Sequence, residues 1–103
     1  MPSNSYAILR QAIIDKQQVT CTYQSFHREI CPHVIGMKNG REKVLSFQFA
    51  GDSSRGLPPH GEWRCMFVDQ VQDAMARQGP WHTGGSHTQP QTCVDDVDVE
   101  VDY

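Results

Sequence analysis

Apolar residues near the start of the chain recur at three- and four-residue intervals. Tyr6, Leu9, Ala12 and Ile13 fall on one stripe of the segment 4–16, and this spacing predicts an amphipathic helix. A helix of this length is only marginally stable in water by itself. We therefore expect its apolar stripe to pack against the rest of the chain.

Beyond residue 17 the pattern changes to a two-residue alternation, which predicts half-buried strands. Val19, Cys21 and Tyr23 alternate with threonines in the first of them. An Asn-Gly pair at 39–40 favours a tight hairpin turn. Pro32 predicts an edge position or a bulge, because proline cannot donate a hydrogen bond to a neighbouring strand. Strands are expected over 18–24, 28–36, 41–51 and 62–71.

The remaining segments are less regular. Residues 51–61 contain three glycines and two prolines, a composition that predicts a loop. Residues 70–78 predict a short helix, and residues 79–92 predict an irregular segment. The end of the chain, residues 94–103, alternates valines with acids. It is either a final strand with an acidic solvent face or a disordered tail.

This order of elements sets the expected fold class. One helix followed by short strands, with no strand–helix alternation, excludes a parallel α/β fold. Short antiparallel strands protect their edges well by curling into a barrel. We predict a mainly β domain over residues 1–78, with the N-terminal helix packed on an Sm-like or SH3-like antiparallel barrel of about five strands. Residues 79–103 then form an irregular acidic C-terminal segment.

The net charge of −3 conceals an uneven distribution. Five of the twelve acidic residues lie in 95–103, so the rest of the chain has nine basic against seven acidic residues and a charge of +2. This is far below the basic surplus of proteins that bind DNA unaided. The chain has neither an apolar run of about 18 residues nor a signal-peptide pattern at its start. We therefore expect a cytoplasmic protein outside the membrane.

The four cysteines include no Cys-x-x-Cys pair. Cys21, Cys31 and Cys65 fall in strand-like runs, where a free thiol packs as a small apolar side chain. This favours free cysteines in a reducing compartment. A disulfide stays open, because connectivity cannot be read from sequence alone.

Motifs that carry chemistry are scarce. His82, His87 and Cys93 are spaced too widely for a structural zinc site, whose paired ligands lie about two to four residues apart. The chain has no Gly-x-Ser-x-Gly or His-Glu-x-x-His motif, and the serine-containing stretch 51–56 lacks the lysine of a phosphate-binding loop. We predict a non-catalytic protein with no metal and no cofactor.

Arg28 and Arg64 are the candidate binding residues. Each lies on a predicted strand and is flanked by apolar residues. A guanidinium group offers a fixed fork of donors that suits a phosphate or a carboxylate. The alternative is a solvated face or an ion pair with Glu29, Glu62 or Asp69. The residues alone leave both interpretations open.

The chain contains three stretches, LRQAIIDKQQVTCTY, HREICPHVIG and WRCMFVDQV, whose order and spacing resemble the WYL domain. This family is a small Sm-like or SH3-like barrel found in many bacterial transcriptional regulators. The similarity covers roughly residues 7–72. The stretch EKVLSFQFAG occupies the place of the strand that carries the name-giving Trp-Tyr-Leu. Lys43, Val44 and Leu45 stand there instead, so a role of those aromatic residues does not carry over.

The resemblance implies a ligand sensor that holds a nucleotide or single-stranded nucleic acid on basic side chains of one barrel face. The matching positions are Arg28 and Arg64, with Tyr23 nearby. Tyr23, Phe26 and His33 would add a surface on which bases stack. For Tyr23, which shares the face of Val19 and Cys21, core packing is the favoured alternative. The residues that would add positive charge around this site are Lys38, Arg41 and Lys43.

The resemblance also bears on partners. Family members usually carry a DNA-binding winged helix, which is absent here, so we expect a free-standing sensor in transcription regulation or a module whose protein partner supplies the DNA-binding domain. A second class of function is a structural module in which barrel edges and the valine-rich tail pair between chains in a homodimer, without a small ligand. An enzyme is a third class, which no acid–base pair in the sequence supports.

Overall fold

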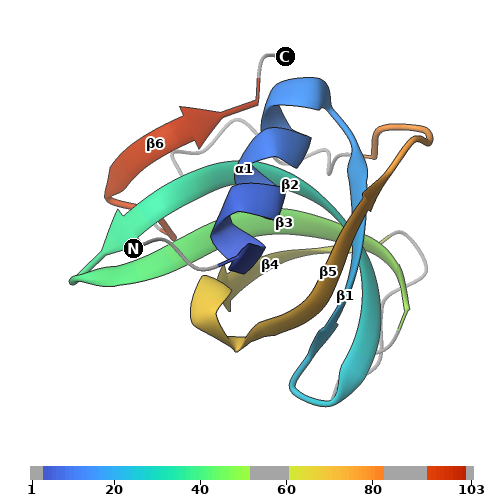
Figure 1. Cartoon of the computed structure of the whole chain (residues 1–103), viewed down its shortest axis with the longest axis horizontal. Helices are drawn as coiled ribbons and strands as arrows, with labels where there is room; N and C mark the ends of the chain where they lie inside the picture. Colours follow the sequence, from blue (N-terminus) through green and yellow to red (C-terminus); the bar gives the residue numbers. More distant parts are fainter. Residues whose placement is uncertain (1–3, 52–60, 83–92, 102–103) are drawn as a thin grey trace.

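The computed structural model describes residues 4–51, 61–82 and 93–101. The fold is mainly β, with one N-terminal helix packed on a six-stranded antiparallel sheet (Figure 1). The elements in chain order are α1 (Asn4–Asp15), β1 (Gln18–Tyr23), β2 (Phe26–Lys38), β3 (Arg41–Gly51), β4 (Glu62–Phe67), the 3-10 helix η1 (Val68–Gln70), β5 (Val71–Arg77) and β6 (Asp96–Glu100).

The strands follow the order β4-β3-β2-β1-β5, and β6 pairs with β2 off this path. The 13-residue strand β2 pairs with β1 through its first half and with β6 through its second half, while β3 runs along its other side. The end strands β4 and β5 are not paired with each other among the described residues. The sheet is therefore not closed, and the predicted barrel is not confirmed.

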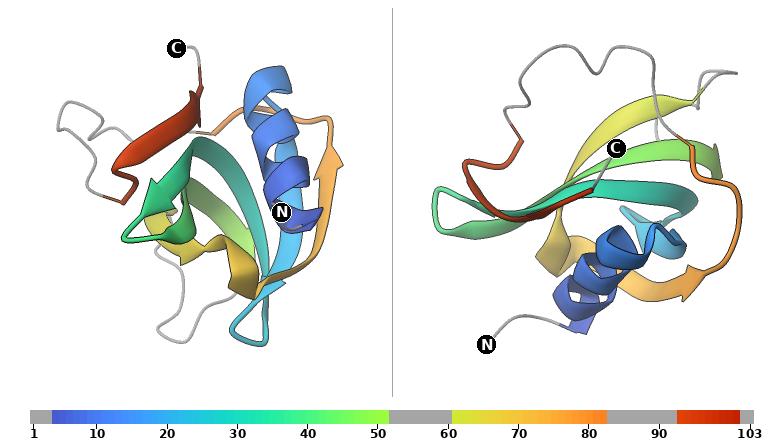
Figure 2. Two further views of the ribbon diagram at one scale, coloured as in Figure 1. Left: turned by 60° about the vertical axis from the view of Figure 1, so that its left-hand side comes forward. Right: turned by 90° about the horizontal axis from the view of Figure 1, so that it is seen from above.

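The predicted helix is confirmed, and its apolar stripe is part of the main core. Tyr6, Leu9, Ala12 and Ile13 are all buried. They pack on one face of the sheet, here called the helix-side face, where α1 contacts β5, β2 and β6 (Figure 2). The other buried residues of this core are Val19, Cys21, Tyr23, Ile30, Ile35, Val44, Met66, Val68, Val71 and Val101.

The opposite face, here called the outer face, is covered by residues from the C-terminal part of the chain. Cys31, Phe47 and Trp63 are register partners across β2, β3 and β4. The backbone N–H of His82 donates to the sulfur of Cys31 at 3.3 Å. A second cluster on this face consists of Val34, Leu45, Cys93 and Val94.

Two local predictions within β2 and β3 are confirmed. Asn39 and Gly40 form the hairpin turn with φ values of 53° and 79°, the positive φ that this turn type requires. The register of β2 against β3 shifts between Pro32 and Val34. Proline therefore lies beside a bulge, as its missing N–H predicts.

Residues 71–77 form strand β5, so the predicted short helix is wrong. Alanine, methionine and glutamine favour a helix locally. Pairing with β1, in which Val19 faces Ala76 and Thr20 faces Met75, outweighs that preference. The alternation near the end of the chain forms strand β6, which settles the choice between a strand and a disordered tail for Asp96–Glu100.

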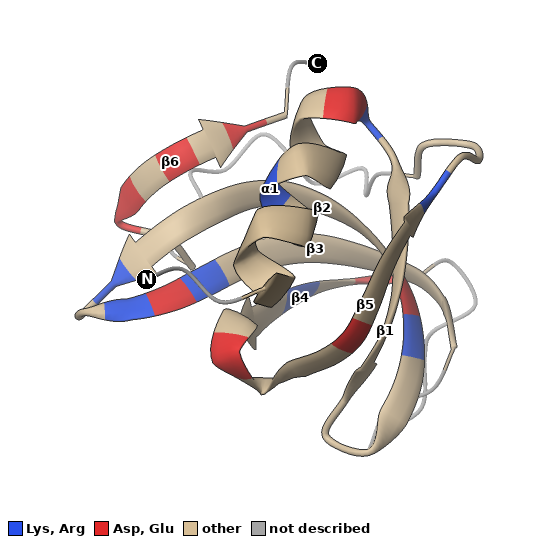
Figure 3. Cartoon of the chain, in the orientation of Figure 1, with Lys and Arg blue, Asp and Glu red and all other residues tan. Residues whose placement is uncertain are grey.

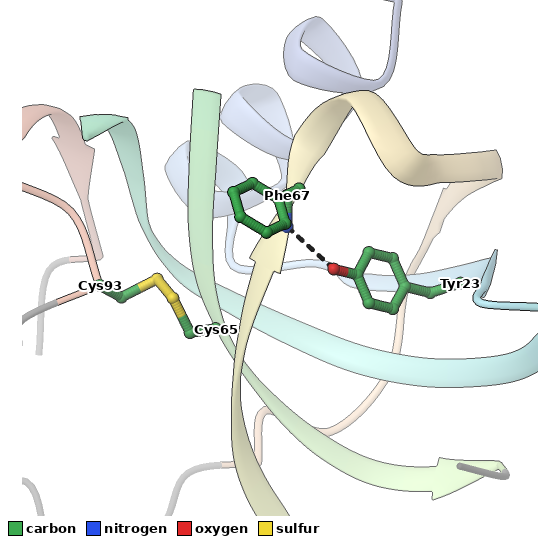
Figure 4. Close-up of a disulfide and its surroundings, with 4 residues drawn as sticks. All are labelled: Tyr23, Cys65, Phe67 and Cys93. Carbon is green, nitrogen blue, oxygen red and sulfur yellow. Dashed lines mark hydrogen bonds between the residues drawn. A yellow bond between two sulfur atoms is a disulfide. The ribbon is translucent and has the colours of Figure 1, made fainter. Parts of the chain in front are cut away.

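Cys65 and Cys93 form a disulfide, with Cα atoms 5.6 Å apart (Figure 4). The expectation of free cysteines is therefore wrong for this pair, and it no longer supports a reducing compartment. Cys21 and Cys31 are free and buried. Burial raises the pKa of the Cys21 thiol to about 11 and also raises the pKa of Cys31, so neither is a reactive thiolate near pH 7.

Most of the predicted loop over 51–61 and of the irregular segment over 79–92 lies outside the described residues. No helix within the described ranges is long and apolar enough to cross a membrane.

Candidate anion-binding site

Arg28 and Arg64 lie on the same face of the sheet. Arg28 is the register partner of Cys21, which belongs to the helix-side core. Arg64 is the register partner of Ser46, two residues from the buried Gln48, which faces Ile30 of that core. Paired residues of antiparallel strands project to the same face. Both arginines therefore belong to the helix-side face.

The guanidinium group of Arg28 is buried, with only 3% of the residue exposed. Its Nη1 donates to Oε1 of Gln48 at 3.3 Å, and its Nη2 donates to Oε1 of Gln24 at 3.5 Å. Its central carbon lies 5.1 Å from the ring centroid of Tyr23. Gln48 donates from its own Nε2 to the carbonyl oxygen of Ala50 at 3.2 Å, which leaves its side-chain oxygen for Arg28.

The positive charge of Arg28 has no ion-pair partner in the described part of the chain. Its Nε is buried and has no hydrogen-bond partner there either. Burial lowers the pKa of Arg28, and the positive charge of Arg64 lowers it further. Burying an ion costs several kcal/mol, whereas an aromatic ring or a neutral amide returns only about 1–2 kcal/mol each. An anion beside Arg28 would offset this cost.

Arg64 is the more accessible member of the pair. Its Nη2 forms an ion pair with Oε2 of Glu62 at 3.1 Å, and 19% of its side chain is exposed. Glu62 thus compensates part of the charge of Arg64, whereas Arg28 itself has no carboxylate partner among the described residues. The pair therefore contacts solvent on the Arg64 side, because Arg28 itself is covered.

Tyr23 lies beside Arg28 but does not offer an open stacking surface. The residue is 6% exposed and belongs to the main core. Its hydroxyl oxygen accepts a hydrogen bond from the backbone N–H of Phe67 at 3.1 Å (Figure 4). Tyr23 therefore supplies the wall on which the Arg28 guanidinium rests.

The structure separates His33 from the two arginines. His33 is fully buried, and its ring centroid lies 4.7 Å from that of Trp63 and 4.9 Å from that of Trp81. Its Nδ1 lies 2.7 Å from the carbonyl oxygen of Cys31. Cys31 and Trp63 lie on the outer face, so His33 is not part of the site.

Arg41 is also separated from the arginine pair. The register of β2 and β3 runs from Arg28 opposite Gly51 to Lys38 opposite Arg41, a span of about 30 Å at the rise of a strand. Arg41 forms an ion pair with Asp69 at 3.0 Å. Lysines and arginines gather at this hairpin end, whereas β6 is acidic (Figure 3).

Two basic residues at the hairpin end, Arg41 and Lys43, contact the aromatic ring of Phe67. The guanidinium carbon of Arg41 and Nζ of Lys43 lie 3.9 and 3.8 Å from the ring centroid of Phe67. Burial lowers the pKa of Lys43, and the charges of Lys38 and Arg41 lower it further. Arg41 and Lys43 therefore form a cluster with Phe67 that is separate from the Arg28–Arg64 pair.

Two residues that orient Arg28 were not foreseen from the sequence. Gln24 lies in the β1–β2 turn with φ of 52°. Gln48 lies on β3, where the apolar alternation of Leu45 and Phe47 predicts that the outer face is the buried one. The signal that could have identified Gln48 is its phase, because it faces Ile30 across the β2–β3 pair.

Within the described ranges, no group of three or more His, Cys, Asp or Glu side chains is arranged to hold a metal ion. His87, one of the three residues weighed for zinc, lies outside those ranges. Comparisons of the chain with protein-family models, with curated proteins and with solved structures find no match.

Proposed function

We propose that this chain is a non-catalytic binding module whose Arg28–Arg64 pair takes a phosphate group of a nucleotide or of a short nucleic-acid strand. The observation that carries the proposal is the state of Arg28. Its guanidinium is buried next to a second arginine, and no described carboxylate neutralises it. A bound anion supplies the missing charge.

Phosphate suits this pair better than a single carboxylate. A phosphate group carries one to two negative charges and several strong acceptor oxygens. Two guanidinium forks can share those oxygens, and Glu62 already occupies part of Arg64. A simple carboxylate would contribute one charge and two oxygens, so it should bind more weakly than a phosphate of similar size.

We also propose that the sheet is an Sm-like or SH3-like barrel. An Sm-like or SH3-like barrel is supported by the connection between β4 and β5, the two ends of the sheet path, through the three residues of η1. A place in bacterial transcription regulation, beside a partner with a DNA-binding domain, is supported by the sequence resemblance described above.

The experiment is a calorimetric titration with AMP, ADP, ATP, a short single-stranded oligonucleotide and a dicarboxylate, on the wild type, Arg64→Gln and Arg41→Gln. We expect a phosphate ligand to bind and Arg64→Gln to weaken it at least about tenfold, because one charge-assisted contact is lost. Affinity should fall steeply with salt. Arg41→Gln is the matched control and should bind like the wild type.

Two results would contradict the proposal. One is the absence of binding by every phosphate ligand at low salt. The other is a ligand that Arg64→Gln and the wild type bind equally well.

A further inference from the structure

Strand β5 leaves one backbone edge open. It ends the sheet path, so no strand within the described residues pairs with its outer side. Natural edge strands are commonly protected by lysine, proline or a bulge. The register shift between Gln72 and Met75 places a bulge in the first half of β5. The second half, Ala74–Arg77, has neither lysine nor proline.

Exposed apolar surface adjoins this open edge. Met75 is 68% exposed, the highest value among the exposed large apolar residues of the described chain. A largely open surface cavity of about 420 Å³ lies between α1 and β5, and every residue that lines it is uncharged. Its walls include Ala7, Ile8 and Gln11 of α1 together with Ala74, Met75 and Ala76 of β5.

We propose that β5 pairs antiparallel with β5 of a second copy of this chain, about a two-fold axis at Met75. An axis at this position brings Asp73 of each copy, which lies in the β5 bulge with φ of 54°, near the partner subunit's Arg77, so opposite charges flank the axis on both sides. Asp73 is exposed, and Arg77 keeps 44% of its side chain exposed beside its ion pair with Glu29.

The chemistry of the surface favours a second copy as the occupant. The chain has a net charge of −3, so two copies repel each other, and a contact surface without net charge avoids adding to this repulsion. The uncharged cavity and the Asp73–Arg77 exchange satisfy this condition. A two-fold contact of this kind also closes on itself, so assembly stops at the dimer.

This dimer is independent of the proposed anion site. Arg28 and Arg64 lie on β2 and β4, and neither lines the cavity beside β5. A variant that breaks the dimer should therefore bind phosphate ligands like the wild type. Failure of one proposal leaves the other standing.

Sedimentation equilibrium on the full chain tests the surface, over about 1 µM to 1 mM, a range that brackets typical weak association. We expect the wild type to show a monomer–dimer equilibrium and Met75→Lys to weaken it at least about tenfold, because a charge would be placed on the axis. Val97→Lys is the matched control, since Val97 is another exposed apolar residue on a different strand, β6. A strict monomer, or equal weakening by both variants, overturns the proposal, as does a dimer that Met75→Lys leaves intact.

A cysteine on the axis tests the register. Opposed residues of an antiparallel pair have Cα atoms about 4.5–5.5 Å apart, which lies within the range that a disulfide spans. Met75→Cys should therefore form a covalent dimer under mild oxidation, whereas Val97→Cys should not. The free thiols of Cys21 and Cys31 are buried and do not compete. A dimer that Met75→Cys fails to cross-link, or equal cross-linking by Val97→Cys, overturns the two-fold at Met75.

Discussion

The two faces of the sheet bury polar groups in different ways. On the outer face, His33 lies between two tryptophans and its Nδ1 meets the carbonyl oxygen of Cys31. On the helix-side face, Arg28 is buried just as deeply, but its Nε has no partner in the described chain. Burial alone therefore does not separate a structural residue from a binding residue. The informative difference is whether the chain itself completes the contacts.

This contrast assigns different consequences to substitutions on the two faces. Changes on the outer face should alter the free energy of unfolding and leave ligand affinity intact. Changes at the polar end of the helix-side face should alter affinity at little cost in stability.

The largest effect on stability should come from Cys65→Ser. The disulfide joins residues 28 positions apart, and closing a loop of this length contributes about 3–4 kcal/mol in the chain-entropy account. Urea unfolding should show a loss of that size, with the affinity of the folded protein for a phosphate ligand unchanged. Dithiothreitol should lower the stability of the wild type to the same level and leave the variant unaffected. A loss below about 1 kcal/mol would contradict the role given to the disulfide.

Arg28→Met should change stability less than Cys65→Ser does, and it should abolish the binding of phosphate ligands. An apolar side chain of similar length avoids the burial of an unpaired charge, so stability should stay constant or rise by about 1–2 kcal/mol. Phosphate ligands should no longer bind measurably. Urea unfolding and calorimetry check the two parts. A loss of about 3 kcal/mol or more would show that Arg28 is structural instead.

The smallest effect concerns the attachment of β6 to α1. The Tyr6 hydroxyl donates to Oδ2 of Asp98 at 2.7 Å, and Arg10 Nε donates to the same oxygen at 3.0 Å. The hydrogen bond from Tyr6 lowers the pKa of Asp98 most, and Arg10 lowers it further. The folded state thus favours the carboxylate. Its contribution is present above about pH 4 and is lost as the pH falls through the lowered pKa.

The same contact has an alkaline limit. Burial, followed by the hydrogen bond to Asp98, raises the pKa of Tyr6 to about 12. The folded state favours the neutral phenol, so this contribution is present below about pH 10 and is lost as the pH rises towards 12. Tyr6→Phe should remove the alkaline limb of the pH profile of the unfolding free energy and reduce the acidic limb, because Arg10 keeps its contact with Asp98. An unchanged profile would contradict the assignment.

Much of the fold could be predicted because local pattern and tertiary packing agree. The stripe of α1 and the alternation of β1 are confirmed residue by residue. The prediction failed at β5, where good helix formers are held in a strand by pairing with β1. It was also incomplete at β3: the alternation of Leu45 and Phe47 identifies one apolar face, whereas Val44 and Gln48 on the other face are buried too.

The candidate site could be predicted from the sequence only in part. Arg28 and Arg64 could be singled out as strand arginines, but their shared face depends on the registers of β1–β2, β2–β3 and β3–β4. The bulge between Pro32 and Val34 interrupts the alternation of β2 at His33, so strand phase could not assign that residue. The Cys65–Cys93 pair has no sequence signature, because its 28-residue separation is closed only by the tertiary fold.

An arginine side-chain NMR spectrum, recorded during a titration with ATP at low salt, tests whether Arg28 and Arg64 bind a phosphate group together. Each arginine contributes one Nε–H signal, which single substitutions assign. We expect the Arg28 and Arg64 signals to shift together and to saturate as ATP is added. The Arg41 signal is the internal control and should not shift. Unchanged Arg28 and Arg64 signals throughout the titration would contradict the account, as would a shift confined to Arg41.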